Sequence, residues 1–281
     1  MHRCQLTLAV VAVLAVAHQA SAQQRPLVTE DPEPIGAGRL LVEAGVDIAH
    51  NQEYPASGLQ GNLWRVPAIG LSFGISSIAE FQLDSGINFL SITEGHAAPL
   101  SNLLTVTGDR THDIEDIVVA TKIRLKAEGA HSPSVAVRFA TRLPNARNES
   151  GLGLDTTDFS MALLGARTVQ SIRVVANLGV AILGDPTDGQ RQNNVLTYGL
   201  SLARATTDHA ELVGELNGRI STRSGDPFPG TESKGLLVVG ARYTRGSYRL
   251  DAGLFWGLTP VSPTIGFTTG VTYVFHAFQV P

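Results

Sequence analysis

The chain consists largely of stretches in which apolar side chains alternate with polar or small ones, and the connectors between these stretches are alternately short and long. About twelve such stretches of roughly 10 to 14 residues follow residue 38, and a tilted strand of that length can cross a bilayer. Outer-membrane barrels have tight turns at one end and longer loops at the other. The sequence therefore predicts an all-β fold, an antiparallel transmembrane β-barrel of about 12 strands with short periplasmic turns and long extracellular loops.

The alternation is clear in residues 172–183, where Val174, Leu178 and Val180 share one face and Arg173 and Asn177 share the other. The expected strands are residues 39–49, 62–75, 78–90, 115–127, 134–142, 157–168, 172–183, 193–206, 210–220, 234–245, 247–257 and 263–275. The expected short connectors are residues 76–77, 128–132, 169–170, 207–208 and 246, and the expected long ones are residues 50–61, 91–114, 143–154, 185–192 and 221–233.

Three observations indicate that the apolar face points outward to lipid. No segment has a convincing 3.6-residue pattern, so no helices are expected to cover the sheet. Many strands carry acids and bases on the polar face, which a water-filled lumen tolerates and a dry core does not. Aromatic residues also gather near the expected strand ends, as interfacial girdles do: Phe73, Phe81, Tyr243, Tyr248, Trp256, Phe267 and Phe159.

The second expected strand departs from this pattern. Arg65 and Pro67 have the same parity as the apolar residues Ile69, Leu71 and Phe73. Proline cannot donate a hydrogen bond to a neighbouring strand. We therefore expect either a β-bulge or a late strand start near Pro67.

The first 22 residues have the features of a secretory signal peptide: Arg3, an apolar run over residues 6–17, and a small-residue cleavage site ending at Ala22. We expect cleavage near Ala22, so that residues 1–22 are the signal peptide, residues 23–38 a periplasmic N-terminal segment, residues 39–275 the β-barrel and residues 276–281 a C-terminal tail. Cys4, the one cysteine of the sequence, lies within this signal peptide. Cleavage would therefore leave a mature chain without cysteine and without disulfides.

Charge and hydropathy exclude other classes of protein. Loss of Arg3 removes one of 21 basic residues and leaves 25 acidic ones, a net charge of about −5. The chain has no basic block of the kind that binds nucleic acid, so nucleic acid is not an expected partner. No apolar run of about 18 residues follows the signal, which excludes an inner-membrane helical protein. The expected location is the bacterial outer membrane, with outer-membrane lipid as a partner.

The polar faces of the expected strands predict a charged lumen. Its candidate pore-lining residues are Glu43, Asp47, Glu80, Asp84, Lys122, Arg124, Arg138, Arg173, Glu211, Glu215, Arg242 and Arg249. We call Lys122, Arg124, Arg138 and Arg173 the basic wall, and we expect it to favour carboxylates. The leading hypothesis is an open or gated diffusion channel for a small organic solute. The alternative is a plugged barrel that transports nothing and acts through its loops, since a barrel of this size lies between filled and open ones.

An enzyme is not expected. A barrel hydrolase needs serine and histidine within hydrogen-bond reach, and the histidines after the signal lie in connectors, turns or the tail: His50, His96, His112, His131, His209 and His276. Residues 109–113 contain Asp and His without the spacing of a metal site, so we interpret them as a solvated loop. No cofactor or metal is predicted.

The last expected strand resembles the signal that bacterial outer-membrane barrels present to their barrel-assembly machinery. Thr268, Gly270, Tyr273 and Phe275 match its polar, glycine and two aromatic positions. One departure is that six residues, 276–281, follow Phe275, whereas many such barrels end at the aromatic residue. The resemblance implies an outer-membrane protein that this machinery inserts.

A second resemblance involves both ends of the chain after the signal. Residues 25–45, RPLVTEDPEPIGAGRLLVEAG, and residues 250–275, LDAGLFWGLTPVSPTIGFTTGVTYVF, are similar to the opening and closing segments of the family named for the MetA pathway of phenol degradation. The residues between them carry no motif of that family. The resemblance implies an outer-membrane barrel that passes aromatic or other hydrophobic compounds.

Overall fold

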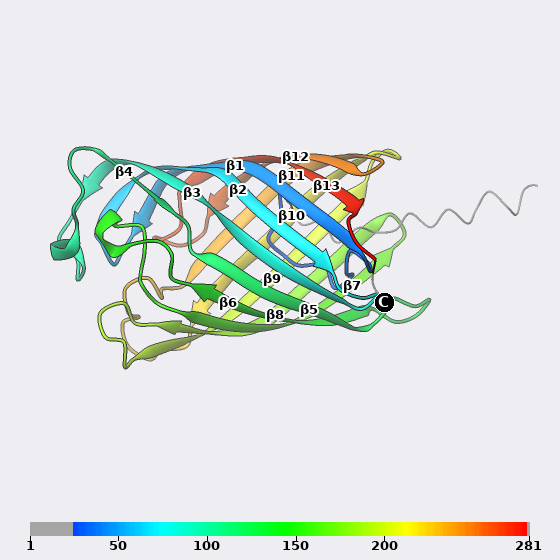
Figure 1. Cartoon of the computed structure of the whole chain (residues 1–281), viewed down its shortest axis with the longest axis horizontal. Helices are drawn as coiled ribbons and strands as arrows, with labels where there is room; N and C mark the ends of the chain where they lie inside the picture. The colour runs from blue at the N-terminus through cyan, green and yellow to red at the C-terminus, as the bar shows by residue number, and fades with distance from the viewer. Residues whose placement is uncertain (1–24, 280–281) are drawn as a thin grey trace, which may run out of the picture.

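The computed structural model describes residues 25–279, and within them thirteen strands form one sheet. Each strand pairs antiparallel with its neighbours, and β1 pairs with both β2 and the last strand, β13, so the sheet closes into a barrel (Figure 1). Twelve strands close the barrel, and β4 is an extra strand that pairs only with β3. The predicted all-β barrel of about 12 strands is confirmed.

The strand bounds lie close to those expected from the alternation. They are β1 (Arg39–Tyr54), β2 (Leu59–Gly74), β3 (Ala79–Gly95), β4 (Arg110–Ile114), β5 (Ile117–Lys126), β6 (Ser134–Leu143), β7 (Asp158–Val169), β8 (Ile172–Gly184), β9 (Gln192–Ala205), β10 (Ala210–Ser221), β11 (Lys234–Arg245), β12 (Tyr248–Gly257) and β13 (Ile265–His276). Two short 3-10 helices, η1 (Ser101–Leu103) and η2 (Asn148–Ser150), lie in connectors. The described residues contain no helix that is long and apolar enough to cross a membrane.

Two of the expected long loops are shorter than expected, because strands continue into them. Residues 50–61 were expected to be one loop, but β1 and β2 stay paired as far as Tyr54 and Leu59, which leaves only residues 55–58 between them. Residues 91–114 contain the end of β3, η1 and β4. The reason is that inter-strand hydrogen bonds continue beyond the span in which side chains alternate strictly, and the sequence pattern does not detect them.

The irregularity expected near Pro67 is a bulge. The register between β2 and β3 shifts between Arg65 and Ala68, and the register between β1 and β2 shifts at the same place. A late strand start is wrong, since β2 begins at Leu59. The bulge changes the parity of β2. As a result, Arg65 lies on the inner face, where Asp47 and Glu115 bind it.

The outer surface of the barrel is apolar. On β8, Leu178 is 65% exposed, and Val180 and Ile182 on the same face are also exposed. Exposed leucine, valine and isoleucine side chains recur on the outer face of the other strands, as in a barrel surrounded by lipid. Near the short-turn end, the rings of Tyr248 and Tyr273 stack with their centroids 4.4 Å apart.

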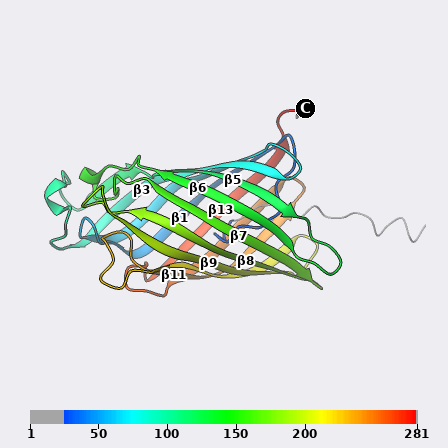
Figure 2. The same ribbon diagram turned by 90° about the horizontal axis from the view of Figure 1, so that it is seen from below.

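Residues 25–35, upstream of β1, lie inside the barrel (Figure 2), and we call them the luminal segment. Residues 23–38 were expected in the periplasm, but residues 25–35 lie in the lumen instead, because their polar groups bind side chains of the inner wall. The expected signal peptide, residues 1–22, lies outside the described residues. In the tail, the amides of Ala277 and Phe278 donate to the Gly38 carbonyl at the short-turn end.

Candidate functional site

The luminal segment crosses the inner faces of strands from both halves of the barrel. Arg25 contacts β1 and β13, and the amides of Val28 and Thr29 donate to Glu215 on β10. Glu30 binds Asn177 on β8 through its backbone amide and carbonyl. Further on, the Ile35 amide donates to Glu80 on β3. Because these contacts lie on so many strands, the segment follows the wall as a partial hoop and narrows the lumen.

Two glycines make room for the first residue of this hoop. Gly45 on β1 and Gly270 on β13 lie opposite each other, and the Arg25 guanidinium lies against both. A Cβ at position 270 would lie 2.5 Å from Arg25 Nε, so a larger residue would push Arg25 away. Arg25 donates to Asp47 at 3.0 Å and to Thr268 at 2.9 Å. Gly270 and Thr268 therefore contact the luminal segment, and their role as an assembly signal with Tyr273 and Phe275 stays a prediction.

The middle of the segment is held by an apolar contact and a carboxylate. Leu27 packs with Val213 and Val238 on β10 and β11. Glu215 accepts three hydrogen bonds from the next two residues: from the Val28 amide at 2.8 Å and from the amide and hydroxyl of Thr29 at 2.6 Å each. The amides of Val28 and Thr29 have no strand to pair with, because the segment lies outside the sheet, and Glu215 supplies the hydrogen-bond acceptors that they need.

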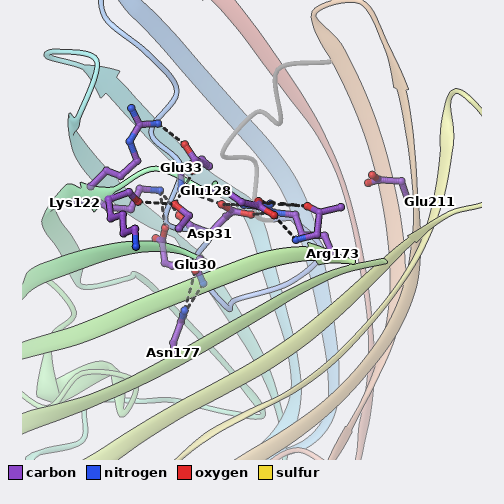
Figure 3. A network of polar contacts seen from close by, with 12 residues as sticks. Glu30, Asp31, Glu33, Lys122, Glu128, Arg173, Asn177 and Glu211 are labelled. Carbon is purple, nitrogen blue, oxygen red and sulfur yellow. Dashed lines mark hydrogen bonds and ion pairs between the residues drawn. The ribbon is translucent and has the colours of Figure 1, made fainter. Parts of the chain in front are cut away.

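The acidic residues of the segment bind the basic wall (Figure 3). Glu30 lies 3.3 Å from Lys122 Nζ and 3.1 Å from Arg138 Nε. Asp31 accepts a hydrogen bond from Arg173 Nη2 at 2.7 Å. Glu33 forms an ion pair with Arg124. The wall that we expected to attract a carboxylate solute therefore already binds carboxylates of the same chain.

Lys122 is the centre of this network. Its side chain is fully buried, and it forms ion pairs with Glu80 at 2.9 Å and with Glu30. Burial opposes the ionisation of Glu30, but the charges of Lys122 and Arg138 outweigh burial and hold the pKa of Glu30 below its ordinary value. A buried cation with two carboxylate partners and a backbone carbonyl contact fixes the position of the segment.

The remaining predicted lumen residues form two groups. Near Arg25, Asp47 binds Arg25 and Arg65, Glu43 accepts from Thr272 at 3.1 Å, and Arg242 donates to the Arg25 carbonyl at 2.8 Å. The other group consists of looser pairs, Asp84 with Arg138 at 3.9 Å and Glu211 with Arg249 at 4.0 Å. The first group therefore contacts the luminal segment directly, and the looser pairs keep their charges balanced along the wall.

The sequence analysis missed three features of the lumen. It did not predict that Glu30, Asp31 and Glu33 bind the basic wall, although four inward basic residues opposite three acidic residues were a signal for it. It did not place Arg65 in the lumen, because the bulge reverses the parity. It also missed Lys234, which lies at the first position of β11, where no alternation precedes it.

Three adjoining cavities occupy the lumen around the segment. One of 590 Å³ is lined by Glu30, Asn177, Arg219, Lys234 and Phe255, among others. One of 380 Å³ lies toward the long loops, and its walls include Arg219 and Lys234 again. One of 410 Å³ lies beside Arg25 and shares Glu30 and Phe255 with the first. Volumes of this size can hold small organic molecules.

The residues considered for metal binding have other surroundings. In residues 25–279, no group of three or more His, Cys, Asp or Glu side chains is arranged to hold a metal ion. His112 stacks on Phe89 with ring centroids 5.7 Å apart, and His50 Nδ1 lies 2.6 Å from Asn62 Oδ1. These histidines therefore have local partners, and the expected absence of an enzyme, cofactor or metal stays a prediction.

Solved structures of outer-membrane proteins have the same fold. An outer membrane channel from Pseudomonas putida F1 aligns with 87% of this chain and 98% of that chain, with a TM-score of 0.61 and 13% sequence identity. The NanC porin aligns with 83% of this chain and 98% of that chain, with a TM-score of 0.52 and 8% identity. No family model and no curated protein matches the sequence. The comparisons therefore support an outer-membrane barrel fold, and the resemblance to the MetA-pathway family stays a prediction.

Proposed function

We propose that the protein is an outer-membrane channel for small organic solutes, and that its luminal segment gates the passage. The observation that carries this proposal is the series of adjoining cavities that extends from the long loops to Arg25. Each cavity shares wall residues with the next, so a solute that enters among the loops reaches the luminal segment without crossing the wall. The similar barrels, an outer membrane channel and a porin, support the same function.

The location and partners follow from the surface. Lipid of the outer membrane covers the exposed apolar face. The signal peptide directs export and is cleaved near Ala22, and the barrel-assembly machinery inserts the barrel through its last strand. With the short turns on the periplasmic side, the luminal segment would lie in the periplasmic half of the lumen.

Gating uses the charges of the lumen. With the segment bound, Glu30, Asp31 and Glu33 neutralise the basic wall and occupy part of the cross-section. When the segment leaves the wall, Lys122, Arg124, Arg138 and Arg173 face the path and attract anions. The channel would therefore pass small solutes slowly in its resting state and anionic solutes faster when the segment is displaced.

Solute flux into liposomes tests the proposal. We expect vesicles that contain the purified full-length protein to take up benzoate and a small neutral sugar faster than protein-free vesicles do, and to exclude a large oligosaccharide. A heat-denatured sample is the matched control for leakage caused by added protein. Flux equal to that of protein-free vesicles for both small solutes would refute the proposal.

A closed barrel that acts through its loops is the second candidate. Its support is that residues of many strands hold the luminal segment in place inside the lumen. One of them is the fully buried Lys122 on β5. Deletion of the loop over residues 96–109 separates the two candidates. Persistent flux after this deletion favours the channel, whereas absent flux before and after it, with loss of a surface-binding activity, favours the closed barrel.

A further inference from the structure

Arg219 and Lys234 form an unusual pair on the lumen wall. They lie directly opposite each other on β10 and β11, on the face that lines the two outer cavities. Like charges in that position repel each other and destabilise a sheet. Elsewhere in the lumen, basic side chains are paired with carboxylates, for example Arg142 with Asp116 at 2.5 Å. Within residues 25–279, neither Arg219 nor Lys234 forms an ion pair.

The two cations differ in how they are held. Arg219 is fixed, because Nε donates to the Glu232 carbonyl at 2.8 Å and Nη2 donates to the Gly230 carbonyl at 2.6 Å. Its Nη1 makes no hydrogen bond to the described residues. The Lys234 side chain makes neither a hydrogen bond nor an ion pair within residues 25–279, and this half-buried residue lines the cavity. Glu232 is close enough to interact electrostatically with both cations but forms an ion pair with neither. One oriented guanidinium and one ammonium group without an ion pair therefore make a site for a single carboxylate.

The cavity beside this pair is largely apolar. Leu63, Leu164, Leu236 and Phe255 line it, and Phe255 also packs against the cluster that contains Leu27. A volume of 590 Å³ exceeds what a carboxylate group alone needs, and apolar walls favour a ligand with an apolar body. The charged end would lie at Arg219 and Lys234 and the body against the leucines and Phe255.

We propose that Arg219 and Lys234 are a binding site for small monocarboxylates with an apolar or aromatic body. This inference rests on the proposed function, because it identifies the class of solute that the channel selects. It also moves the selectivity of the lumen away from the basic wall, whose cations already have carboxylate partners. Salt should weaken the binding, because the attraction is electrostatic and the cavity is open to water.

Benzoate binding to the purified full-length protein in detergent tests the site by calorimetry. Arg219→Gln and Lys234→Gln should each raise the Kd for benzoate at least tenfold, and the charge-preserving Lys234→Arg should change it less than threefold. Lys126→Gln, at the exposed end of β5 near a short turn, is the matched control and should leave the Kd unchanged. Benzyl alcohol, which lacks the charge, should bind more weakly and equally in all variants. Each variant must first retain the strand content of the wild type by circular dichroism.

The possible results separate the site from the channel. Unchanged benzoate affinity in both glutamine variants, or equal affinity for benzyl alcohol and benzoate, would overturn the site even if flux persists. Benzoate binding that depends on Arg219 and Lys234, without any flux in liposomes, would support the site and refute the channel. Binding that depends on these two residues, with flux that falls in the same two variants, would support both the site and the channel.

Discussion

Glu30 holds the luminal segment more strongly than the other acidic residues of the segment, because its carboxylate binds two cations of the wall. Glu30→Gln keeps the size of the side chain and removes its charge. Lys122 keeps Glu80 at 2.9 Å after the change, whereas Arg138 keeps the Gln82 amide oxygen at 2.8 Å and, as its one carboxylate among the described residues, Asp84 at 3.9 Å. The backbone contacts of residue 30 with Asn177 do not depend on the carboxylate and should remain.

The magnitude follows from the burial of these partners. Removal of one member of a buried ion pair costs about 3 to 5 kcal/mol, because the other charge is left uncompensated. Glu80 compensates part of the charge on Lys122, so we expect about 3 kcal/mol of weaker docking. Since about 1.4 kcal/mol corresponds to a factor of ten, the ratio of undocked to docked segment should rise roughly a hundredfold.

Single-channel recording in planar bilayers measures this ratio as the fraction of time at high conductance. Glu94→Gln is the matched control, since Glu94 is exposed near the long loops and forms no ion pair within the described part of the chain. We expect Glu30→Gln to increase the high-conductance fraction strongly and Glu94→Gln to leave it unchanged. If a correctly folded Glu30→Gln protein behaved like the wild type, docking by this carboxylate would be refuted.

Three further predictions concern the same lumen. A Cβ at position 199 would lie 2.6 Å from the Thr29 hydroxyl, and its three nearest atoms would all belong to Thr29. Gly199→Ala should therefore increase the high-conductance fraction and added Thr29→Ala should reverse it; failure of the reversal would contradict this contact. Because docking lowers the pKa of Glu30, docking is favoured above the ordinary pKa of this group and is lost as pH falls through the lowered value. Conductance should therefore stay constant as pH falls from neutral and rise only below the ordinary pKa of a glutamate, and a rise near neutral pH would contradict the assignment. Arg65→Leu leaves Glu115 without its partner and Asp47 with Arg25 alone, so urea unfolding should show a loss of about 1 to 2 kcal/mol, partly restored by Arg65→Lys; equal stability of all three proteins would show that the bulge does not act through this pair.

Strand positions could be predicted well because side chains alternate where one face meets lipid and the other meets the lumen. β8 is an example: Arg173 and Asn177 lie on its inner face, whereas Leu178, Val180 and Ile182 are exposed on its outer face. The extent of the long connectors was overestimated, because β1 and β2 continue as far as Tyr54 and Leu59 by backbone pairing alone. The bulge at Pro67 was one of two alternatives predicted from the parity of polar and apolar residues in this strand. That it turns Arg65 into the lumen could be seen only from the register between β2 and its neighbours.

The luminal segment could not be found from periodicity, because a chain that follows the wall as a hoop has neither a strand nor a helix pattern. Its prolines, Pro26, Pro32 and Pro34, also suit an extended segment that lies outside the sheet. The basic residues of the wall do lie on the inner face, as expected. The carboxylates that bind them, however, were expected to come from a solute and not from the same chain. Comparison of the acidic residues before β1 with the basic residues on β5 and β6 would have suggested an internal partner.

The central claim is that the luminal segment, residues 25–35, controls passage through the lumen. The most direct test compares the single-channel conductance and the reversal potential in a salt gradient between the full-length protein and a variant that lacks these residues. The account predicts a larger and steadier conductance for the variant, with a shift toward anion selectivity because Lys122, Arg124, Arg138 and Arg173 lose the carboxylates that Glu30, Asp31 and Glu33 supply. A folded variant with the conductance and selectivity of the full-length protein would contradict the account.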